Sequence, residues 1–254
     1  MKKLKVYNPF NTKNYYILEK NDKKYFLYHN LKLEISSDGY IPKSGLLFDM
    51  ILSEKNCKDK KVLDLGCGYL GILSLIAYVN GANNVVSIDY DNNCVEWFNK
   101  VISDNNLESI KCFNSNYFQN IDEKDFDLIL TNPPQMPMLN GTLHDFGGED
   151  GRKFILEILE NSYRYLKDDG NIYMLLFDFL GIDQKTGANP PIIELAKKIG
   201  YKDFKVVYET YKEIKEGRIT YQNMPHINKI YPNYDFYQDQ ECKCKMKVLK
   251  IGKW

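Results

Sequence analysis

The sequence lacks three features that would each point to a particular class of protein: closely spaced histidines, an excess of one charge, and a long apolar run. Its three histidines, His29, His144 and His226, have no metal-binding spacing, so no resident metal is expected. Lysine plus arginine equals aspartate plus glutamate at 34 each, so no global positive field is available to hold a nucleic-acid backbone. No apolar run approaches the roughly 18 residues of a membrane span.

Regular disulfide spacing is also missing, although the chain has six cysteines. Cys242 and Cys244 would place two thiols on one face of a strand, but too few further ligands are present for a predicted zinc site. No secretory leader is apparent, so the expected location is the reducing cytoplasm. A length of 254 residues with 44% hydrophobic residues fits one large α/β domain with appendages, or two small domains.

Residues 61–71 read KVLDLGCGYLG and organise the rest of the chain. A short apolar run stops at a glycine turn, and an apolar helical pattern begins directly afterwards at Ile72. Gly66, Gly68 and Gly71 fit the pattern G-x-G-x-x-G. The stretch predicts a strand, a tight turn and a helix, with backbone N–H groups exposed to a ligand.

Two carboxylates flank this turn and indicate which ligand it binds. Asp64 ends the first strand, two residues before Gly66, and Asp89 ends the next strand. A carboxylate at the position of Asp64 would repel the pyrophosphate of a dinucleotide by roughly a few kcal/mol. It would attract the ammonium and sulfonium of S-adenosylmethionine, which has no phosphate. Asp89 stands where a carboxylate holds both ribose hydroxyls, so the sequence predicts S-adenosylmethionine rather than NAD.

Strands and helices alternate along most of the chain, which predicts a doubly wound, mostly parallel α/β sheet. Residues 1–40 are expected to form a β-hairpin appendage that either covers a sheet edge or acts as a lid. Residues 41–254 are expected to form the main domain. Its segment 211–240 has little periodicity and is interpreted as an insertion, either over the active-site face or as a peripheral decoration. The predicted strands are 62–65, 85–88, 110–113, 126–130, 172–177, 204–208 and 244–251.

The reaction is predicted to occur where the strand 126–130 runs into Asn132, Pro133, Pro134 and Gln135. Ligands of open α/β sheets bind beyond the carboxyl ends of the strands. Two prolines fix the backbone and remove two N–H donors, leaving the Asn132 side-chain oxygen and the Pro133 carbonyl as acceptors. Such a corner suits an NH₂ group, because it orients the nitrogen toward the sulfonium methyl.

Together these motifs resemble class I S-adenosylmethionine-dependent methyltransferases of the N-methylating branch, which have a Rossmann-like fold. Ile41-Pro42-Lys43 is similar to the Ile-Pro-Arg entry of protein-glutamine N5-methyltransferases, the release-factor methyltransferases. Residues 147–151 are similar to their Gly-Gly-x-Asp-Gly segment. The resemblance implies cofactor-binding residues Asp64, Gly66, Cys67, Gly68, Asp89, Tyr90, Asn116, Tyr117 and Asn132, with Asn116 and Tyr117 at the adenine.

The resemblance also implies that Asn132 and Pro133 grip the acceptor amide, with Gln135 as the third predicted catalytic residue. Gln135 stands where the family usually has Tyr or Phe, so the stacking surface for a planar group is missing. The acceptor is therefore predicted to be a protein glutamine or a small molecule. Three alternatives stay open: an RNA base, as in the ribosomal-RNA guanine methyltransferases that share the Asn-Pro-Pro corner, an inactive cofactor-binding scaffold, and NAD-dependent oxidoreduction.

Overall fold

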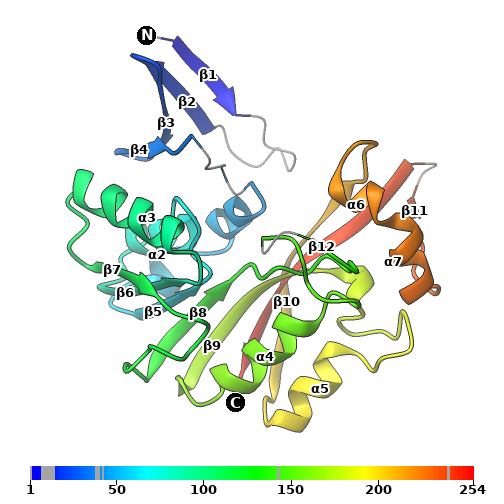
Figure 1. Cartoon of the computed structure of the whole chain (residues 1–254). Helices are drawn as coiled ribbons and strands as arrows, with labels where there is room; N and C mark the ends of the chain where they lie inside the picture. The colour runs from blue at the N-terminus through cyan, green and yellow to red at the C-terminus, as the bar shows by residue number, and fades with distance from the viewer. Residues whose placement is uncertain (1, 7–14, 38–40, 42, 142–143, 239–240) are drawn as a thin grey trace. The chain divides into compact units, whose positions relative to one another are not determined.

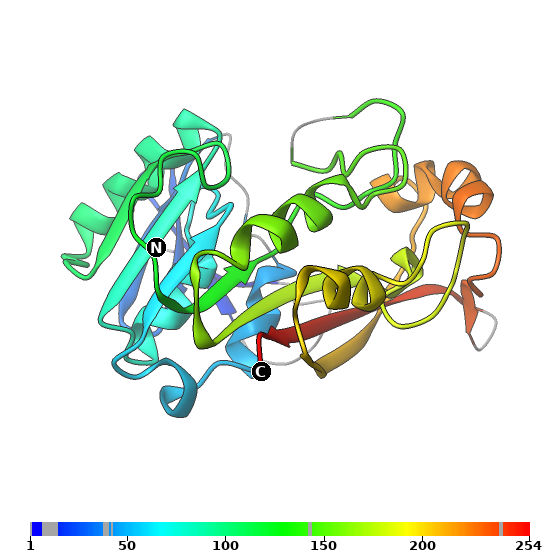
Figure 2. The same cartoon turned by 90° about the horizontal axis from the view of Figure 1, so that it is seen from below.

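The structure is a computed structural model that describes residues 2–6, 15–37, 41, 43–141, 144–238 and 241–254. It consists of two units, Met1–Thr131 and Asn132–Trp254, whose elements are drawn in Figures 1 and 2. Pro42 of the predicted entry motif lies outside the described residues. So do residues 7–14 and 38–40 of the predicted appendage and residues 239–240 of the predicted insertion.

A parallel sheet forms the centre of the first unit, with the strand order β8-β5-β6-β7. Val, Ile and Leu dominate β5, β6 and β8, and nearly all of their residues are buried, as expected for parallel strands covered on both faces. Helices α2 and α3 lie together on one face (Figure 1). The elements are α1 (Glu54–Cys57), β5 (Lys61–Leu65), α2 (Ile72–Val79), β6 (Asn84–Asp89), α3 (Asn92–Asp104), β7 (Ile110–Asn114) and β8 (Phe126–Thr131).

The N-terminal segment forms a four-stranded antiparallel sheet in the order β1-β2-β3-β4, which is larger than a simple hairpin. Two tyrosines attach this sheet to the 3₁₀ helix η1 (Gly45–Met50). The hydroxyls of Tyr15 and Tyr28 donate to the two oxygens of the buried Asp49 carboxylate, at 3.1 and 2.8 Å. The strands are β1 (Lys2–Val6), β2 (Tyr15–Lys20), β3 (Lys23–Tyr28) and β4 (Leu31–Ile35).

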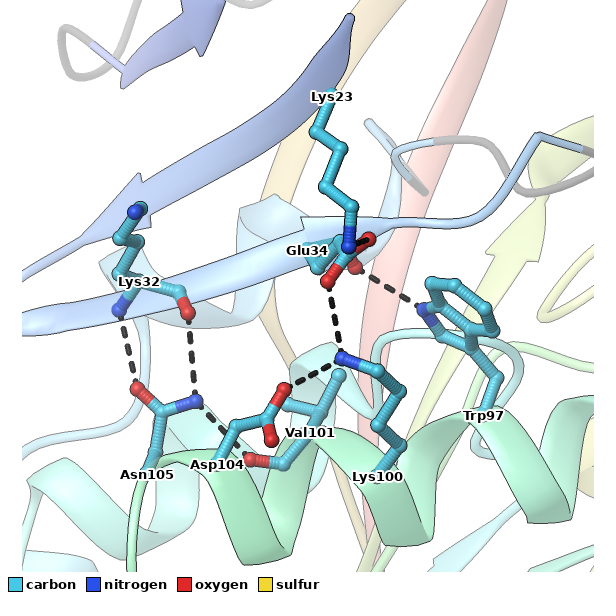
Figure 3. A network of polar contacts seen from close by, with 8 residues as sticks. All are labelled: Lys23, Lys32, Glu34, Trp97, Lys100, Val101, Asp104 and Asn105. Carbon is cyan, nitrogen blue, oxygen red and sulfur yellow. Dashed lines mark hydrogen bonds and ion pairs between the residues drawn. The ribbon is translucent and has the colours of Figure 1, made fainter. Parts of the chain in front are cut away.

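A second attachment joins β4 to helix α3 through Glu34 (Figure 3). Its carboxylate pairs with Lys23 at 2.8 Å and with Lys100 at 2.9 Å, and these contacts lower the pKa of Glu34. Its carbonyl accepts a hydrogen bond of 3.0 Å from the indole N–H of Trp97. The sheet is therefore fixed at two places in the first unit. Whether it also serves as a lid stays a prediction.

An antiparallel sheet with the order β10-β12-β9 forms the centre of the second unit. Helices α4 and α5 pack side by side against it (Figure 2). Strand β10 extends well beyond the predicted 204–208, because β12 pairs with it along its length. The elements are α4 (Lys153–Ser162), β9 (Leu166–Phe177), η2 (Asp178–Leu180), α5 (Ile192–Ile199), β10 (Asp203–Glu213), α6 (Ile219–Gln222), α7 (Met224–Ile230), β11 (Tyr237–Gln238) and β12 (Glu241–Gly252).

The predicted insertion contains α6, α7 and β11 and packs on the end of β9. The ring of Phe179 in η2 contacts the rings of Tyr231, Tyr234 and Phe236, with centroid separations of 5.8, 6.1 and 5.6 Å. These aromatic contacts explain why a segment with little periodicity holds a defined place. The α/β class and the alternation of strands and helices are confirmed, whereas the predicted domain boundaries stay predictions.

Candidate active site

The glycine loop, residues 66–71, joins β5 to α2. Gly66 and Gly68 have positive φ angles of 81° and 63°, and no atom lies within 4 Å of where a Cβ would be. The backbone of the loop is therefore open on that side. Gly71 has another role, because a Cβ there would lie 2.0 Å from the ring of Phe98 in α3. The first two glycines leave room for a ligand, and the third lets two helices approach.

Asp89, at the end of β6, fixes this loop. Its Oδ2 accepts a hydrogen bond of 2.8 Å from the Gly68 N–H, and its Oδ1 accepts one of 2.9 Å from the Asp91 N–H. Asp89 is partly exposed. The predicted ribose-binding residue thus lies directly against the glycine loop.

Asp64, in β5, lies in the interior of the first unit. Its carboxylate is fully buried and accepts hydrogen bonds from the N–H and hydroxyl of Ser74 in α2, at 3.0 and 2.6 Å. The Ser74 hydroxyl also contacts that of Ser87 at 2.7 Å. Burial raises the pKa of Asp64 to about 7. Among the described residues, nothing donates to its Oδ1, which is a buried acceptor without a partner.

The predicted adenine residues lie beside Asp89. Ser115 brings them there, because its N–H donates to the Asp89 carbonyl at 3.0 Å and its hydroxyl donates to the Tyr117 carbonyl at 2.6 Å. Tyr117 has a φ of 50°, an unusual value for a residue other than glycine. Tyr90 is exposed, as expected of a residue at the rim of a site. The structure thus brings together Asp89, Tyr90, Asn116 and Tyr117.

Cys67 lies within the glycine loop, and its sulfur is 3.8 Å from that of Cys112 in β7. The pattern around residue 67 gave no reason to link it with Cys112, because the two are 45 residues apart in sequence. The register of β6 and β7, which pairs Ser87 with Cys112, determines this proximity.

In the second unit, Asn132 to Gln135 form the predicted acceptor corner, called the acceptor corner below. The side-chain amide of Gln135 is buried and used within the fold: its Nε2 donates to the Leu175 carbonyl at 2.8 Å, and its Oε1 accepts from the Phe177 N–H at 2.7 Å. The same Nε2 lies 3.3 Å from the Pro133 carbonyl. Gln135 therefore fastens the corner to β9, a positioning role that sequence reasoning missed.

Residues 145–151 form a brace loop that packs against this corner. The Met136 N–H donates to the Asp145 carbonyl at 3.0 Å, and the Gly147 N–H donates to the Met136 carbonyl at 2.9 Å. A Cβ at Gly147 would lie 2.6 Å from Gln135 Cα, and one at Gly151 would lie 2.6 Å from the Gln135 carbonyl oxygen. Glycine is required at both positions by this close packing.

The predicted insertion contacts the brace loop. The hydroxyl of Tyr231 donates to the Asp150 carbonyl, and His226 Nε2 lies 2.8 Å from the Glu149 carbonyl oxygen. Asn189 donates to the Asp150 carboxylate at 2.9 Å. These contacts favour an insertion over the active-site face rather than a peripheral decoration, because the brace loop that it contacts packs against the acceptor corner.

The end of β8 is bonded to the end of β5. Thr131, the last residue of β8, is paired in register with Leu65 of β5, and its hydroxyl donates to the Leu65 carbonyl at 3.0 Å. Leu65 immediately precedes Gly66, and one peptide bond joins Thr131 to Asn132. Within the first unit, the end of β8 is thus bonded to the strand that leads into the glycine loop.

In the part of the chain that the structure covers, no three His, Cys, Asp or Glu side chains are grouped to hold a metal ion. Within the same residues, no helix has the length and apolar character needed to cross a membrane.

The chain is similar to several curated methyltransferases. Release factor glutamine methyltransferase of Francisella tularensis is 26% identical over 166 residues, which make up 59% of this chain and 58% of that protein. Ribosomal protein L11 methyltransferase of Thermosipho melanesiensis is 32% identical over 128 residues, 46% of this chain and 48% of that protein. The chain thus spans about half to three-fifths of the length of these relatives.

Solved structures show the same fold. TYW2 of M. jannaschii, in complex with AdoMet, superposes with a TM-score of 0.52 at 13% identity, covering 93% of this chain and 89% of that one. At this identity the likeness is one of fold, and the predicted Rossmann-like class is confirmed.

A family comparison gives the assignment. Residues 36–207 match the methyltransferase small domain, which is more than half of the 254-residue chain. The predicted S-adenosylmethionine-dependent methyltransferase domain, with that cofactor, is confirmed. The chain belongs to the methyltransferase small domain family.

Proposed function

We propose that this protein transfers a methyl group from S-adenosylmethionine to an amide or amine nitrogen. The observation that carries the proposal is the acceptor corner, where an asparagine and two prolines follow a sheet strand and Gln135 fastens them to β9. A rigid corner rich in acceptors and poor in donors suits an NH₂ group. Orientation is the main contribution that a protein makes to a displacement whose electrophile is already activated.

The cofactor residues of this proposal are those gathered around the glycine loop. Asp89 would hold the ribose hydroxyls, Asn116 and Tyr117 would contact adenine, and Gly66 and Gly68 leave the backbone open. The unpartnered oxygen of the buried Asp64 carboxylate would accept from the cofactor's ammonium. Bound here, the cofactor supplies a methyl group on a positively charged sulfur. Cys67 and Tyr90 complete the proposed cofactor site.

At the corner, the Asn132 side-chain oxygen and the Pro133 carbonyl would each accept an N–H of the acceptor. Both hydrogens are then directed away from the attacking lone pair, which stays free for the methyl group. With an amide acceptor, the methylated nitrogen is strongly acidic and loses its proton to water after transfer, so no general base is required beforehand. An amine acceptor would have to bind in its neutral form, and its methylated ammonium would lose a proton to solvent more slowly. Gln135 would act by positioning the other two residues, because its own amide is already hydrogen-bonded.

The nature of the acceptor is supported by two considerations. Relatives carry the names release factor glutamine methyltransferase and ribosomal protein L11 methyltransferase, which favours a protein nitrogen. The buried amide of Gln135 offers no ring on which a planar nucleic-acid base could stack. A protein glutamine or a small amide or amine is therefore proposed ahead of RNA, in a reaction that takes place in the cytoplasm.

The test uses full-length protein, tritiated S-adenosylmethionine and panels of glutamine-containing peptides, small amides and amines, and RNA oligonucleotides. Labelled product should form with an amide or amine, and acid hydrolysis should release an N-methylated compound. Asn132→Ala should reduce turnover by roughly 10²–10³-fold, the size expected when an orienting hydrogen bond is lost. Cofactor affinity, measured by calorimetry, should stay within about twofold.

Asn161→Ala is the matched control, because Asn161 lies in α4 and, within the described residues, its side chain bonds only to the Glu157 carbonyl of the same helix. Its turnover should equal that of the wild type. Undiminished turnover in Asn132→Ala would contradict the proposed corner. If label appears on RNA bases instead, the acceptor is a nucleic acid. If no compound in any panel becomes labelled while the cofactor binds normally, the protein is better explained as an inactive cofactor-binding scaffold.

A further inference from the structure

Lys212, in β10, has an ammonium group in unusual surroundings. Its Nζ lies 4.8 Å from the centre of the Phe177 ring, and that ring stacks on Phe179 at 5.1 Å. Within the residues that the structure covers, this ammonium makes no hydrogen bond and no ion pair. Burial lowers the pKa of Lys212 below its ordinary value, and the nearby charge of Arg218 acts in the same direction.

Lys247, in the adjacent strand β12, is a lysine of the same sheet whose charge is paired within the fold. Its side chain is 10% exposed and pairs with Asp178 at 2.7 Å and Asp183 at 3.8 Å. Burial acts to lower the pKa of Lys247, but the hydrogen bond and charge of Asp178 raise it overall. Buried charges are normally compensated in this way. Among the described residues, carboxylates lie at bonding distance from Lys247 and none does so from Lys212.

Two contacts place Lys212 beside the acceptor corner. The Phe177 ring beneath its ammonium belongs to the residue whose N–H is bonded to Gln135. Asp145, whose negative charge acts on Lys212, has its carbonyl bonded to the Met136 N–H. A cation that makes no hydrogen bond or ion pair among the described residues therefore lies next to the residues that are proposed to hold the reacting nitrogen.

We propose that Lys212 binds an anionic group, a carboxylate or a phosphate, of the acceptor molecule. The Phe177 ring covers one side of the half-buried ammonium and stacks on Phe179, and a charge pair is stronger there than in open water. An anionic group of the acceptor would form the ion pair that Lys212 lacks among the described residues. The assignment of this anion to the acceptor rests on the function proposed above, whereas the anion site itself does not.

The experiment measures side-chain pKa values by NMR on full-length protein labelled with ¹³C and ¹⁵N in lysine. Lys212→Met identifies the Lys212 signal, and Lys247 is the internal control. Sodium acetate and sodium phosphate are titrated separately against sodium chloride at constant ionic strength, so the two arms distinguish carboxylate from phosphate. In saturating probe, the pKa of Lys212 should rise by about one unit, equivalent to about tenfold tighter binding of the anion to the charged form.

The pKa of Lys247 should not move, because its partners are already in place. An unchanged Lys212 in both arms, or an equal shift of both lysines, would overturn the inference. Because the readout does not require methyl transfer, the two proposals fail independently. A shift of Lys212 with undiminished turnover in Asn132→Ala would leave the anion site and remove the acceptor corner. Methylation of a neutral acceptor, with no change in the pKa of Lys212, would leave the acceptor corner and remove the anion site.

Discussion

Replacing Gln135 with alanine tests the architecture of the acceptor corner directly. The change removes the partners of two buried backbone groups, the Leu175 carbonyl and the Phe177 N–H. Each orphaned group costs about 1–3 kcal/mol, so Gln135→Ala should lose about 2–6 kcal/mol of unfolding free energy. For a chain of this size, that loss corresponds to a fall in Tm of about 5–20 °C.

Differential scanning calorimetry and urea unfolding measure this loss. Gln222→Ala is the control, since Gln222 is exposed and, in the part of the chain that the structure covers, its side chain makes only one long hydrogen bond, of 3.5 Å to the Gly217 carbonyl. The control should unfold within about 0.5 kcal/mol of the wild type. If Gln135→Ala unfolds together with the control, the proposed fastening of the corner to β9 is wrong.

The substitution Gln135→Glu sharpens the test through its pH dependence. When protonated, the new carboxyl can still donate to the Leu175 carbonyl; when ionised, it cannot and carries a buried charge. Its folded-state pKa should therefore be raised above the ordinary value of about 4.3. Its stabilising contribution is fully present below that ordinary pKa and is lost as pH rises through the folded-state pKa. The Tm gap to the wild type should widen from pH 4.5 to 8, and a constant gap would refute the hydrogen-bond assignment.

Two further predictions concern the first unit. Because burial raises the pKa of Asp64 to about 7, its contribution to stability is full below about pH 4 and is lost as pH rises through about 7. Urea unfolding should show this loss in the wild type and a flatter profile in Asp64→Asn; parallel profiles would contradict it. Gly71→Ala should cost about 2–4 kcal/mol, since its Cβ would meet Phe98 at a strained φ, whereas Gly66→Ala, in open space, should cost about 1 kcal/mol. Equal thermal shifts would refute this difference.

The strand-turn-helix at the glycine loop could be predicted from sequence because its signals are local. An apolar run, positive-φ glycines and a helical pattern lie within about a dozen residues, and the structure has the same elements in the same order. The position of Asp89 against Gly68 also followed, since adjacent parallel strands end at one edge of a sheet.

Features that depend on distant contacts could not be predicted. Asp64 is enclosed by Ser74 and by Ser87 beyond it, and no pattern around Asp64 specifies that pairing. Gln135 was expected at the acceptor because its neighbours in sequence are there. Its actual partners lie 40 and 42 residues further along the chain. The length of β10 likewise depends on β12, which sequence periodicity within β10 does not reveal.

The residue at position 135 has a consequence for how an acceptor could be recognised. An aromatic ring there, as the related families usually have, could stack on a planar group; a glutamine that is hydrogen-bonded within the fold cannot. Selectivity must then come from other side chains near the corner. In the second unit, the Lys212 ammonium over the Phe177 ring could bind a negatively charged group of the acceptor. The brace loop, held by Tyr231, could limit the size and shape of the acceptor. This arrangement favours an acceptor that carries an anionic group near its reacting nitrogen. It does not select an acceptor for being planar.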